Sequence, residues 1–479
     1  MYNGLVGFQR QNVNSAFTYT QAIQDRKSRV SRLTFNRKSA FFPLLPSPSP
    51  HYTPMLSSYA TRCQLAMYNT SYPLSPEHWR PYRSAAPLHS GSEISVYLHI
   101  PFCPQLCTFC EYTRMATPEV ELQAHYVRTL LGELHEFGEQ HNNLTLEGFD
   151  IGGGTPTALS PALLEQLVQG YQQFLGNRNK AADFESSIES TFQTASDEKL
   201  QIIGQGGIKR LSLGVQSSST ELLRNHARRL ETVEFMQRVL HSAHAAGIQK
   251  VNLDFMYGLP GQSTESIMAD LELVQKLAPE QVTLYELRTN MIHLPASTAE
   301  HRTNAYHIWY AGLQELGYRA PFGRNTFSLN PADEGCSSYL RKRMFNGTPY
   351  RGFGVSAQSM GTDGVCYNAG KGLHGAALRR CVSAPGYAPQ DVYHLPPAEL
   401  AAKYIAVAGY SGQFSLAAAS RISGCNAVEY YAEPIRFCLE NGLLEAIPDD
   451  ILRITPKGFK HIGAVFSLFY SPLNKTLEI

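Results

Sequence analysis

Three cysteines in one short segment, Cys103, Cys107 and Cys110, carry the clearest chemical signal in the chain. Their spacing is Cys-x3-Cys-x2-Cys, and they follow an apolar, strand-like run at 95–100. Three thiolates can bind three irons of a cubic [4Fe–4S] cluster, which ordinarily takes four cysteines, so one iron would stay open for a ligand that is not protein. A reactive cluster needs such an open iron and a structural cluster does not. Zinc is the alternative for a Cys-x2-Cys pair, but no second Cys or His pair follows at zinc spacing.

Further residues that could bind a small ligand lie at the ends of predicted strands. Consecutive glycines let backbone approach a ligand closely and expose N–H donors. Carboxylates can accept from ribose hydroxyls or an ammonium, and an arginine can bind a carboxylate through two hydrogen bonds. Each such residue, taken alone, could equally be a solvated polar residue at a strand end. The candidates are Gly153, Thr155, Glu189, Gln216, Arg228 and Asp254.

The elements that must position these residues alternate between strand-like and helix-like segments, which is typical of a parallel α/β architecture. We expect helices to begin at Thr117-Pro118, at Ser160-Pro161 and near Glu231, the last ending at Gly247. Six β/α units fit a partial (β/α)6 barrel, in which chemistry lies at the carboxyl ends of the strands. The predicted strands are 95–100, 146–151, 184–189, 208–215, 249–257 and 281–287.

The chain divides into five predicted segments. The first 50 residues carry seven Arg or Lys against one acid, which is typical of a transit peptide, of a disordered basic tail or of a start codon placed too far upstream. The last segment, with a predicted hairpin at 440–459, resembles a winged-helix-like cap, and the lack of a basic recognition helix argues against a DNA-binding domain. The segments are a disordered extension (1–62), a flank (63–94), the barrel (95–290), a barrel extension (291–394) and the cap (395–479).

Composition places the chain among globular proteins and excludes several classes. Of 479 residues, 43% are hydrophobic and 17% charged, and a net charge of +1 gives no field for nucleic acid. No run has the length of a transmembrane helix. Nine cysteines without disulfide-like pairing indicate a reducing compartment, and we expect a cytoplasmic protein. The six cysteines outside the triad are predicted to be small buried residues.

The segment YLHIPFCPQLCTFCEY resembles the radical S-adenosylmethionine (SAM) superfamily, and within it the HemN-like branch. The resemblance implies that the open iron chelates the amino and carboxylate groups of SAM, and that one electron splits SAM into methionine and a 5′-deoxyadenosyl radical. It places Gly153 and Thr155 beside the SAM amino group, and Tyr97 and Phe109 beside the adenine and the cluster. It also implies SAM contacts for Glu189, Gln216, Arg228 and Asp254.

Two departures from the coproporphyrinogen dehydrogenases of this branch concern the substrate. Their arginine before a Tyr-Thr-Ser-Tyr-Pro-like segment is replaced by Met67, ahead of Tyr68–Pro73 here. Their glycine and fourth cysteine after the cluster loop are replaced by Glu111 and Tyr112. These changes argue against decarboxylation of a porphyrinogen. Glu111 could be a solvent-facing loop residue or a functional one.

Relatives without the fourth cysteine include the class C radical SAM methyltransferases, and the resemblance therefore implies methylation of an sp2 carbon with two SAM molecules. The first expected acceptor is a flat apolar aromatic, menaquinone at C8. The alternatives are oxygen-independent coproporphyrinogen III dehydrogenase and a haem chaperone. Because no flavin or second-cluster motif is visible, we expect an external electron donor such as flavodoxin or ferredoxin.

Overall fold

A computed structural model of the chain describes residues 52–63, 72–73, 76–288, 294 and 297–471. Residues Pro50–Ile479 form one compact unit, built on a large sheet. Six neighbouring strands of this sheet run parallel, each within a few residues of its predicted range, which confirms the α/β class. They are β1 (Glu93–Ile100), β4 (Thr145–Gly153), β5 (Ser186–Ser190), β6 (Arg210–Gln216), β7 (Lys250–Tyr257) and β8 (Gln281–Glu286).

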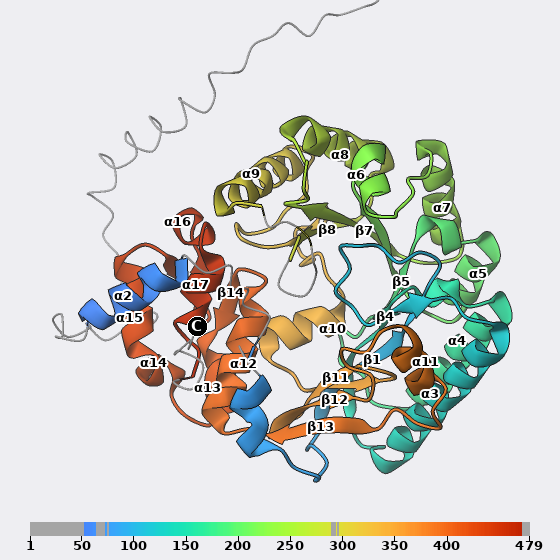
Figure 1. The fold of residues 1–479 in the computed structure, drawn as a ribbon, viewed down its shortest axis with the longest axis horizontal. Coiled ribbons are helices and arrows are strands. Elements are labelled where there is room, and N and C mark those ends of the chain that lie inside the picture. The colour runs from blue at the N-terminus through green and yellow to red at the C-terminus, as the bar shows by residue number, and fades with distance from the viewer. Residues whose placement is uncertain (1–51, 64–71, 74–75, 289–293, 295–296, 472–479) are drawn as a thin grey trace, which may run out of the picture. The chain divides into compact units, whose positions relative to one another are not determined.

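Helices cover the outer side of these strands (Figure 1). Ser160 caps the helix at 161–175 as predicted, and its hydroxyl accepts from the N–H of Leu163. Gly247, with φ +90°, lies just beyond the end of the helix at 233–245. The first helix begins three residues beyond the predicted cap, because the N–H of Thr117 donates to the carbonyl of Cys103 and keeps the chain extended there. The helices are α3 (Val120–Gln140), α4 (Pro161–Leu175), α5 (Asp197–Gln205), α6 (Thr220–Asn225), α7 (Val233–Ala245) and α8 (Thr264–Leu277).

The alternation of side chains along each parallel strand separates the core from the site. On β1, Val96 and Leu98 are fully buried in the hydrophobic core. Tyr97 and His99 point to the other face, where the Tyr97 hydroxyl lies 3.5 Å from Nδ1 of His99. The inner face of the sheet therefore carries the polar residues.

The sheet extends beyond the six strands at both edges, so that eleven of the described strands form it. It crosses the predicted boundary at residue 290; the five-segment division itself stays a prediction. The added strands are β9 (Thr326–Ser328), antiparallel to β8, β10 (Tyr350–Phe353), parallel to β1, and the antiparallel β11 (Gln358–Met360), β12 (Gly364–Asn368) and β13 (Pro389–His394). Between them lie α9 (Ala299–Glu315), α10 (Ser338–Arg341), a π-helical turn η4 (Lys342–Asn346) and α11 (Gly375–Val382).

The carboxyl-terminal region is helical around a small three-stranded sheet, and the predicted hairpin is confirmed as β15 (Leu444–Ile447) and β16 (Ile451–Ile454). The third strand is β14 (Gln413–Ser415). The helices are α12 (Pro397–Gly409), α13 (Leu416–Ser423), α14 (Ala427–Tyr430), α15 (Ala432–Glu440), α16 (Pro456–Phe459) and α17 (Ile462–Ser467). None of the helices in the described part of the chain combines the length and apolarity needed to cross a bilayer.

The predicted disordered extension 1–62 is wrong in its last part, where α2 (Tyr52–Cys63) forms. This helix is held by tertiary packing, since the Tyr59 ring meets Phe437 edge-on at 5.7 Å and Arg62 is buried. Residues 1–51 lie outside the described residues. Of the six other cysteines, Cys336, Cys366 and Cys438 are buried as predicted, Cys63 and Cys381 are partly buried, and Cys425 is exposed.

Candidate functional site

The three-cysteine loop is closed at its base by two short parallel strands, β2 (Phe102–Cys103) and β3 (Met115–Ala116). The N–H of Met115 donates to the carbonyl of Pro101 at 2.8 Å. Inside the loop the Arg114 guanidinium donates to the carbonyl of Cys107 and to that of Tyr112. These bonds fix the loop through the protein's own groups.

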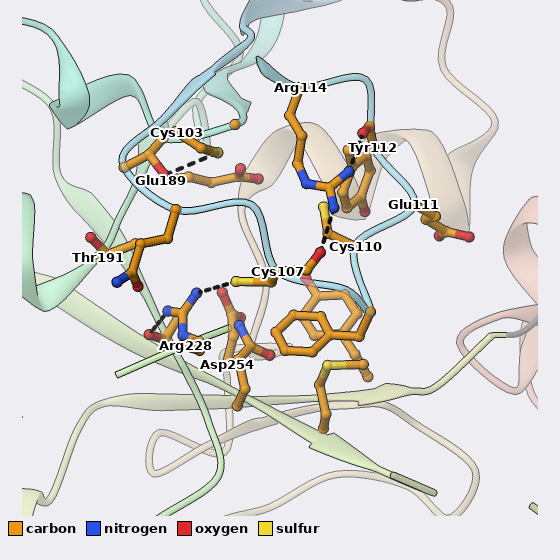
Figure 2. Close-up of a pocket in the computed structure, with 18 of the residues that line it drawn as sticks. Cys103, Cys107, Cys110, Glu111, Tyr112, Arg114, Glu189, Thr191, Arg228 and Asp254 are labelled. Atoms are coloured by element: carbon orange, nitrogen blue, oxygen red, sulfur yellow. Dashed lines mark hydrogen bonds between the residues drawn. The ribbon is translucent and has the colours of Figure 1, made fainter. Parts of the chain in front are cut away.

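Cys103, Cys107 and Cys110 line one cavity (Figure 2). Burial raises the pKa of the Cys103 thiol, and it raises the pKa of Cys110 to about 11 although Arg114 opposes it. Thiols with raised pKa values stay protonated at neutral pH, so a metal that binds here must displace their protons.

The donor set fits an iron–sulfur cluster better than a single metal ion. Among the described residues, no group of three or more His, Cys, Asp or Glu side chains converges closely enough to hold one ion. In a cubane each thiolate binds a different iron, so the three sulfurs need to face one cavity without meeting at a point. The cationic Arg228 has Nη1 3.7 Å from the Cys107 sulfur, which suits a thiolate ligand.

The glycine segment after β4 is explained by the space around it. A Cβ on Gly152 would lie 2.6 Å from the carboxyl carbon of Glu189, and one on Gly154 3.0 Å from the sulfur of Cys103. Gly153 has φ +113° and packs on the His99 ring. The expectation of free N–H donors is wrong, because the N–H groups of Gly153, Gly154 and Thr155 donate to Glu189, Ile100 and Phe102. The segment therefore connects β5 to the base of the cysteine loop through hydrogen bonds.

The predicted strand-end residues meet in the same cavity as the cysteines. The structure places Phe109, Gly153, Thr155, Glu189, Gln216, Arg228 and Asp254 along its wall. Tyr97 does not line this cavity; it stacks on Tyr339 at 5.7 Å. All of these residues stay predictions as SAM contacts.

Burial raises the pKa values of three carboxyl groups that line the cavity, Glu189, Asp254 and Glu286. Burial raises the pKa of Glu189 to about 7, with the N–H of Gly153 opposing it at 3.0 Å from Oε2. Burial likewise raises the pKa of Asp254 to about 6, although the carboxylate accepts from Ser212 and Asn252 at 2.9 and 2.8 Å. Carboxylates that titrate near neutral pH can accept from a ligand's hydroxyl or ammonium groups.

Gln216 ends β6 in a conformation that few residues adopt. Its φ is +77°, and the pairing of β6 with β7 shifts register between Gly214 and Gln216. Bulges and positive φ values in residues other than glycine re-aim side chains and concentrate at functional sites. The carbonyl of Gly214 accepts from Nη2 of Arg228, which connects this bulge to the cysteine loop.

Sequence reasoning predicted Phe109 but missed three other residues of the wall. Tyr285 lies on β8, Arg288 lies just beyond that strand, and Tyr410 follows the end of α12. The strand-end argument could have found Tyr285, since the sixth strand was predicted. No local signal points to Tyr410, which lies some 300 residues beyond the cysteines in sequence and reaches the cavity only through tertiary packing.

Glu111 forms an ion pair with Arg288, and the guanidinium lies 5.7 Å from the centre of the Tyr410 ring. Both charged side chains are less than one-fifth exposed and line the cavity. Glu111 therefore connects the cysteine loop to the end of β8. Its neighbour Tyr112 is 52% exposed and also faces the cavity (Figure 2).

Of the Tyr68–Pro73 segment in the flank, only Tyr72 and Pro73 are described; Tyr68 to Ser71 lie outside the described residues. The Tyr72 hydroxyl donates to Glu399 at 2.8 Å, and its carbonyl accepts from Lys403. Tyr72 thus anchors the flank on α12.

Comparisons with known proteins agree with this geometry. Residues 97–274 match the model of the Radical SAM superfamily. The anaerobic coproporphyrinogen III oxidase 1 of Cereibacter sphaeroides is 34% identical over 194 residues, which are 40% of this chain and 42% of that protein. Residues 97–274 therefore form a radical SAM domain, and the chain is similar to proteins of the HemN-like branch.

Other relatives lie in the same HemN-like branch. The oxygen-independent coproporphyrinogen III oxidase of Salmonella typhimurium is 29% identical over 62% of this chain and 69% of its own length. The heme chaperone HemW of Escherichia coli is 32% identical over 40% of this chain and 50% of its own length. The chain spans about half the length of the first curated relatives it matches.

A solved structure, coproporphyrinogen III oxidase (HemN) of Escherichia coli, shares the fold with a TM-score of 0.65 at 24% identity, over 80% of this chain and 91% of that one. The cofactors of the radical SAM superfamily are a [4Fe–4S] cluster and SAM, and the three-cysteine loop lies within the matched residues.

Proposed function

We propose that this chain is a radical SAM enzyme whose substrate is a porphyrinogen, and that it abstracts hydrogen from the propionate side chains of that macrocycle, as in the coproporphyrinogen III oxidase reaction. Each propionate that reacts would lose a hydrogen atom to the 5′-deoxyadenosyl radical, one electron to an external acceptor and its carboxyl group as carbon dioxide. The observation that carries the proposal is the composition of one cavity, in which the three cysteines share the wall with Phe109, Tyr112, Tyr285 and Tyr410. Aromatic side chains favour packing on the aromatic pyrrole rings of such a substrate. The names of the curated relatives support a porphyrinogen over a quinone.

The residues of this chain would have separate roles in binding the cluster and SAM. Cys103, Cys107 and Cys110 would hold the cluster. When bound, the cluster supplies the electron that cleaves SAM to a 5′-deoxyadenosyl radical. Arg228 carries a positive charge beside the Cys107 sulfur, and Glu189 and Asp254 offer acceptors in the same cavity. Carboxylates at these positions would orient the ribose and the ammonium of SAM.

Methylation of an sp2 carbon, with menaquinone C8 as the first acceptor and two SAM molecules, is the second candidate. Tyr112 favours it, since this side chain stands in the cavity where coproporphyrinogen dehydrogenases carry a further cysteine. The curated relatives named above do not support it.

The discriminating experiment incubates the full chain, loaded with iron and sulfide without oxygen, with SAM and a reductant. With coproporphyrinogen III, the proposal expects 5′-deoxyadenosine and carbon dioxide. S-adenosylhomocysteine and a methylated product from a menaquinone would instead establish the second candidate. Stoichiometric haem binding without SAM cleavage would contradict both and indicate a chaperone.

A matched pair of variants separates the cluster from general thiol chemistry. Cys110→Ser should abolish iron retention and 5′-deoxyadenosine formation, whereas Cys425→Ser, at an exposed cysteine remote in sequence, should preserve both. We also propose that flavodoxin or ferredoxin donates the electron; replacing the chemical reductant with either protein tests this.

A further inference from the structure

Three cationic side chains gather close together near the cavity, and we call them the basic cluster: Arg343 of η4, Lys371 after β12 and Lys403 of α12. Lys403 is 3% exposed, and its ammonium donates to the carbonyl of Tyr72 at 2.8 Å. Burial, together with the positive charges of Arg343 and Lys371, lowers the pKa of Lys403 to about 7. Two neutral side chains connect Arg343 to Lys371: Oε1 of Gln358 lies 3.3 Å from Arg343, Nε2 of Gln358 donates to the Tyr367 hydroxyl at 3.0 Å, and the Lys371 ammonium lies 3.3 Å from the centre of the Tyr367 ring.

No carboxylate among the described residues forms an ion pair with this cluster. None of the ion pairs recorded among the described residues includes Arg343, Lys371 or Lys403. Asp391, which acts on Lys371 from a distance, is 3.1 Å from Arg83. Glu399, one helical turn before Lys403, accepts from Tyr72 and Trp79 instead.

The partners of Arg343 are neutral. Its guanidinium donates to the Tyr339 hydroxyl at 3.4 Å and to Oε1 of Gln358 at 3.3 Å, and it lies 4.4 Å from the centre of the Tyr350 ring. Its buried Nε has no hydrogen-bond partner. A guanidinium has five N–H donors, and a buried donor left unmatched is costly unless a ligand satisfies it.

The basic cluster adjoins the cavity of the cysteines. Tyr339, which accepts a hydrogen bond from Arg343, stacks on Tyr97 of β1. The Tyr97 hydroxyl lies 3.5 Å from the His99 ring, which packs on Gly153 in the wall of that cavity. Arg343, Gln358 and Tyr97 are partly exposed. Lys371 is exposed and has its ammonium 3.3 Å from the centre of the Tyr367 ring.

We propose that the basic cluster is a carboxylate-binding subsite that holds an acidic side group of the substrate, with Arg343 as its main ligand. A carboxylate would accept from Arg343 and offset the repulsion among the three cations. The proposal rests on the proposed function only in taking the cavity as the substrate site. The subsite requires an acidic substrate, whether the reaction is oxidative decarboxylation or methylation.

Binding without turnover tests this subsite. The full chain, loaded with its cluster without oxygen, is titrated with coproporphyrin III, a flat tetracarboxylate, and with its tetramethyl ester, and fluorescence is followed. Arg343→Gln should weaken binding of the acid by about tenfold and leave that of the ester unchanged. Lys371→Gln, at an exposed position, should also weaken binding of the acid, by a smaller factor. This second variant keeps the test possible if Arg343→Gln does not fold.

The matched control is Arg341→Gln, two residues earlier, because this arginine pairs with Asp183 at 2.6 Å. It should leave both titrations unchanged. Equal binding of acid and ester by the unchanged chain, or equal effects of the two arginine variants, would overturn the proposal.

A second arm identifies the source of the carboxylate, since SAM carries one too. S-adenosylhomocysteine is titrated and the number of molecules bound is counted. If Arg343→Gln lowers this number and leaves porphyrin binding intact, the subsite serves SAM and the substrate assignment is overturned. Failure of the proposed function would look different: selective binding of the acid, lost in Arg343→Gln, but no cleavage of SAM with coproporphyrinogen III.

Discussion

At the residue scale, each of the glycines at 152–154 is required by a different neighbour, which leaves no space for a side chain. The carboxylate of Glu189 excludes a side chain at 152, the ring of His99 excludes one at 153, and the cysteine loop excludes one at 154. Their N–H groups are used inside the protein, so what the segment offers a ligand is close backbone and not free donors. The glycines make the loop and the strand ends one rigid wall.

A pair of alanine substitutions separates backbone strain from lost space. Gly207 has φ +82° and nothing within 4 Å of an added Cβ, whereas Gly153 has φ +113° and the His99 ring at 2.6 Å. Gly207→Ala should lower the free energy of unfolding by about 1 kcal/mol, from strain alone. Gly153→Ala should lower it further and weaken SAM binding, because the N–H that holds Glu189 must move. Urea unfolding and SAM titration measure both; equal losses in the two variants would contradict the argument.

Glu111 illustrates where sequence reasoning ended. A carboxylate after Cys110 is equally compatible with a solvent-facing loop and with a role in the site. The structure pairs it with Arg288, far along the chain. Nothing local in either segment predicts that pair, because the end of β8 meets the loop only after the sheet has formed.

At the element scale, the parallel strands were predictable because each is a short apolar or alternating run between helices with clear caps. The edge strands were not predicted as strands of this sheet. β10 joins it beside β1 although some 250 residues separate them in sequence. The site divides in the same way: the strand-end residues of β4 to β7 were found, while Tyr285, Arg288 and Tyr410 were missed.

The inner face of the sheet gathers carboxylates from neighbouring strands. Burial raises the pKa of Asp150 on β4 to about 7, of Glu189 on β5 to about 7 and of Asp254 on β7 to about 6. Arg210 on β6 opposes the shift at all three. The folded chain therefore holds protons that the unfolded chain releases near pH 4.

Because these pKa values are raised on folding, their contribution to stability is present below about pH 4 and is lost as pH rises through about 7. Asp150→Asn should flatten this decline by up to about 1.4 kcal/mol per pH unit. The amide can still accept from the Ser337 hydroxyl, which lies 2.6 Å from the carboxylate. Urea unfolding at several pH values measures the slope. Glu315→Gln, at an exposed carboxyl, should leave the slope unchanged. If Asp150→Asn has the same slope as the unsubstituted chain, Asp150 does not contribute to the pH dependence of stability.

At the scale of the whole molecule, the amino-terminal flank is fastened to the carboxyl-terminal region by one buried carboxylate. Oε2 of Glu399 accepts from the Tyr72 hydroxyl at 2.8 Å and from the Trp79 indole at 2.9 Å. Lys403, one turn later on α12, donates to the Tyr72 carbonyl. The Tyr-Pro of the flank thus has a structural use.

This junction can be tested with the flank's own tryptophan. The chain has two tryptophans, so Trp309→Phe leaves Trp79 as the sole reporter. In that background Glu399→Gln should lower the free energy of unfolding by about 1–3 kcal/mol, because two buried donors lose a charged acceptor. Emission from Trp79 should then change at lower urea than the circular dichroism of the helices, since the flank would detach before the sheet unfolds. The control Glu429→Gln, at an exposed position on α14, should keep both transitions together. Coincident transitions at an unchanged midpoint in Glu399→Gln would mean that the surrounding apolar packing alone holds the flank.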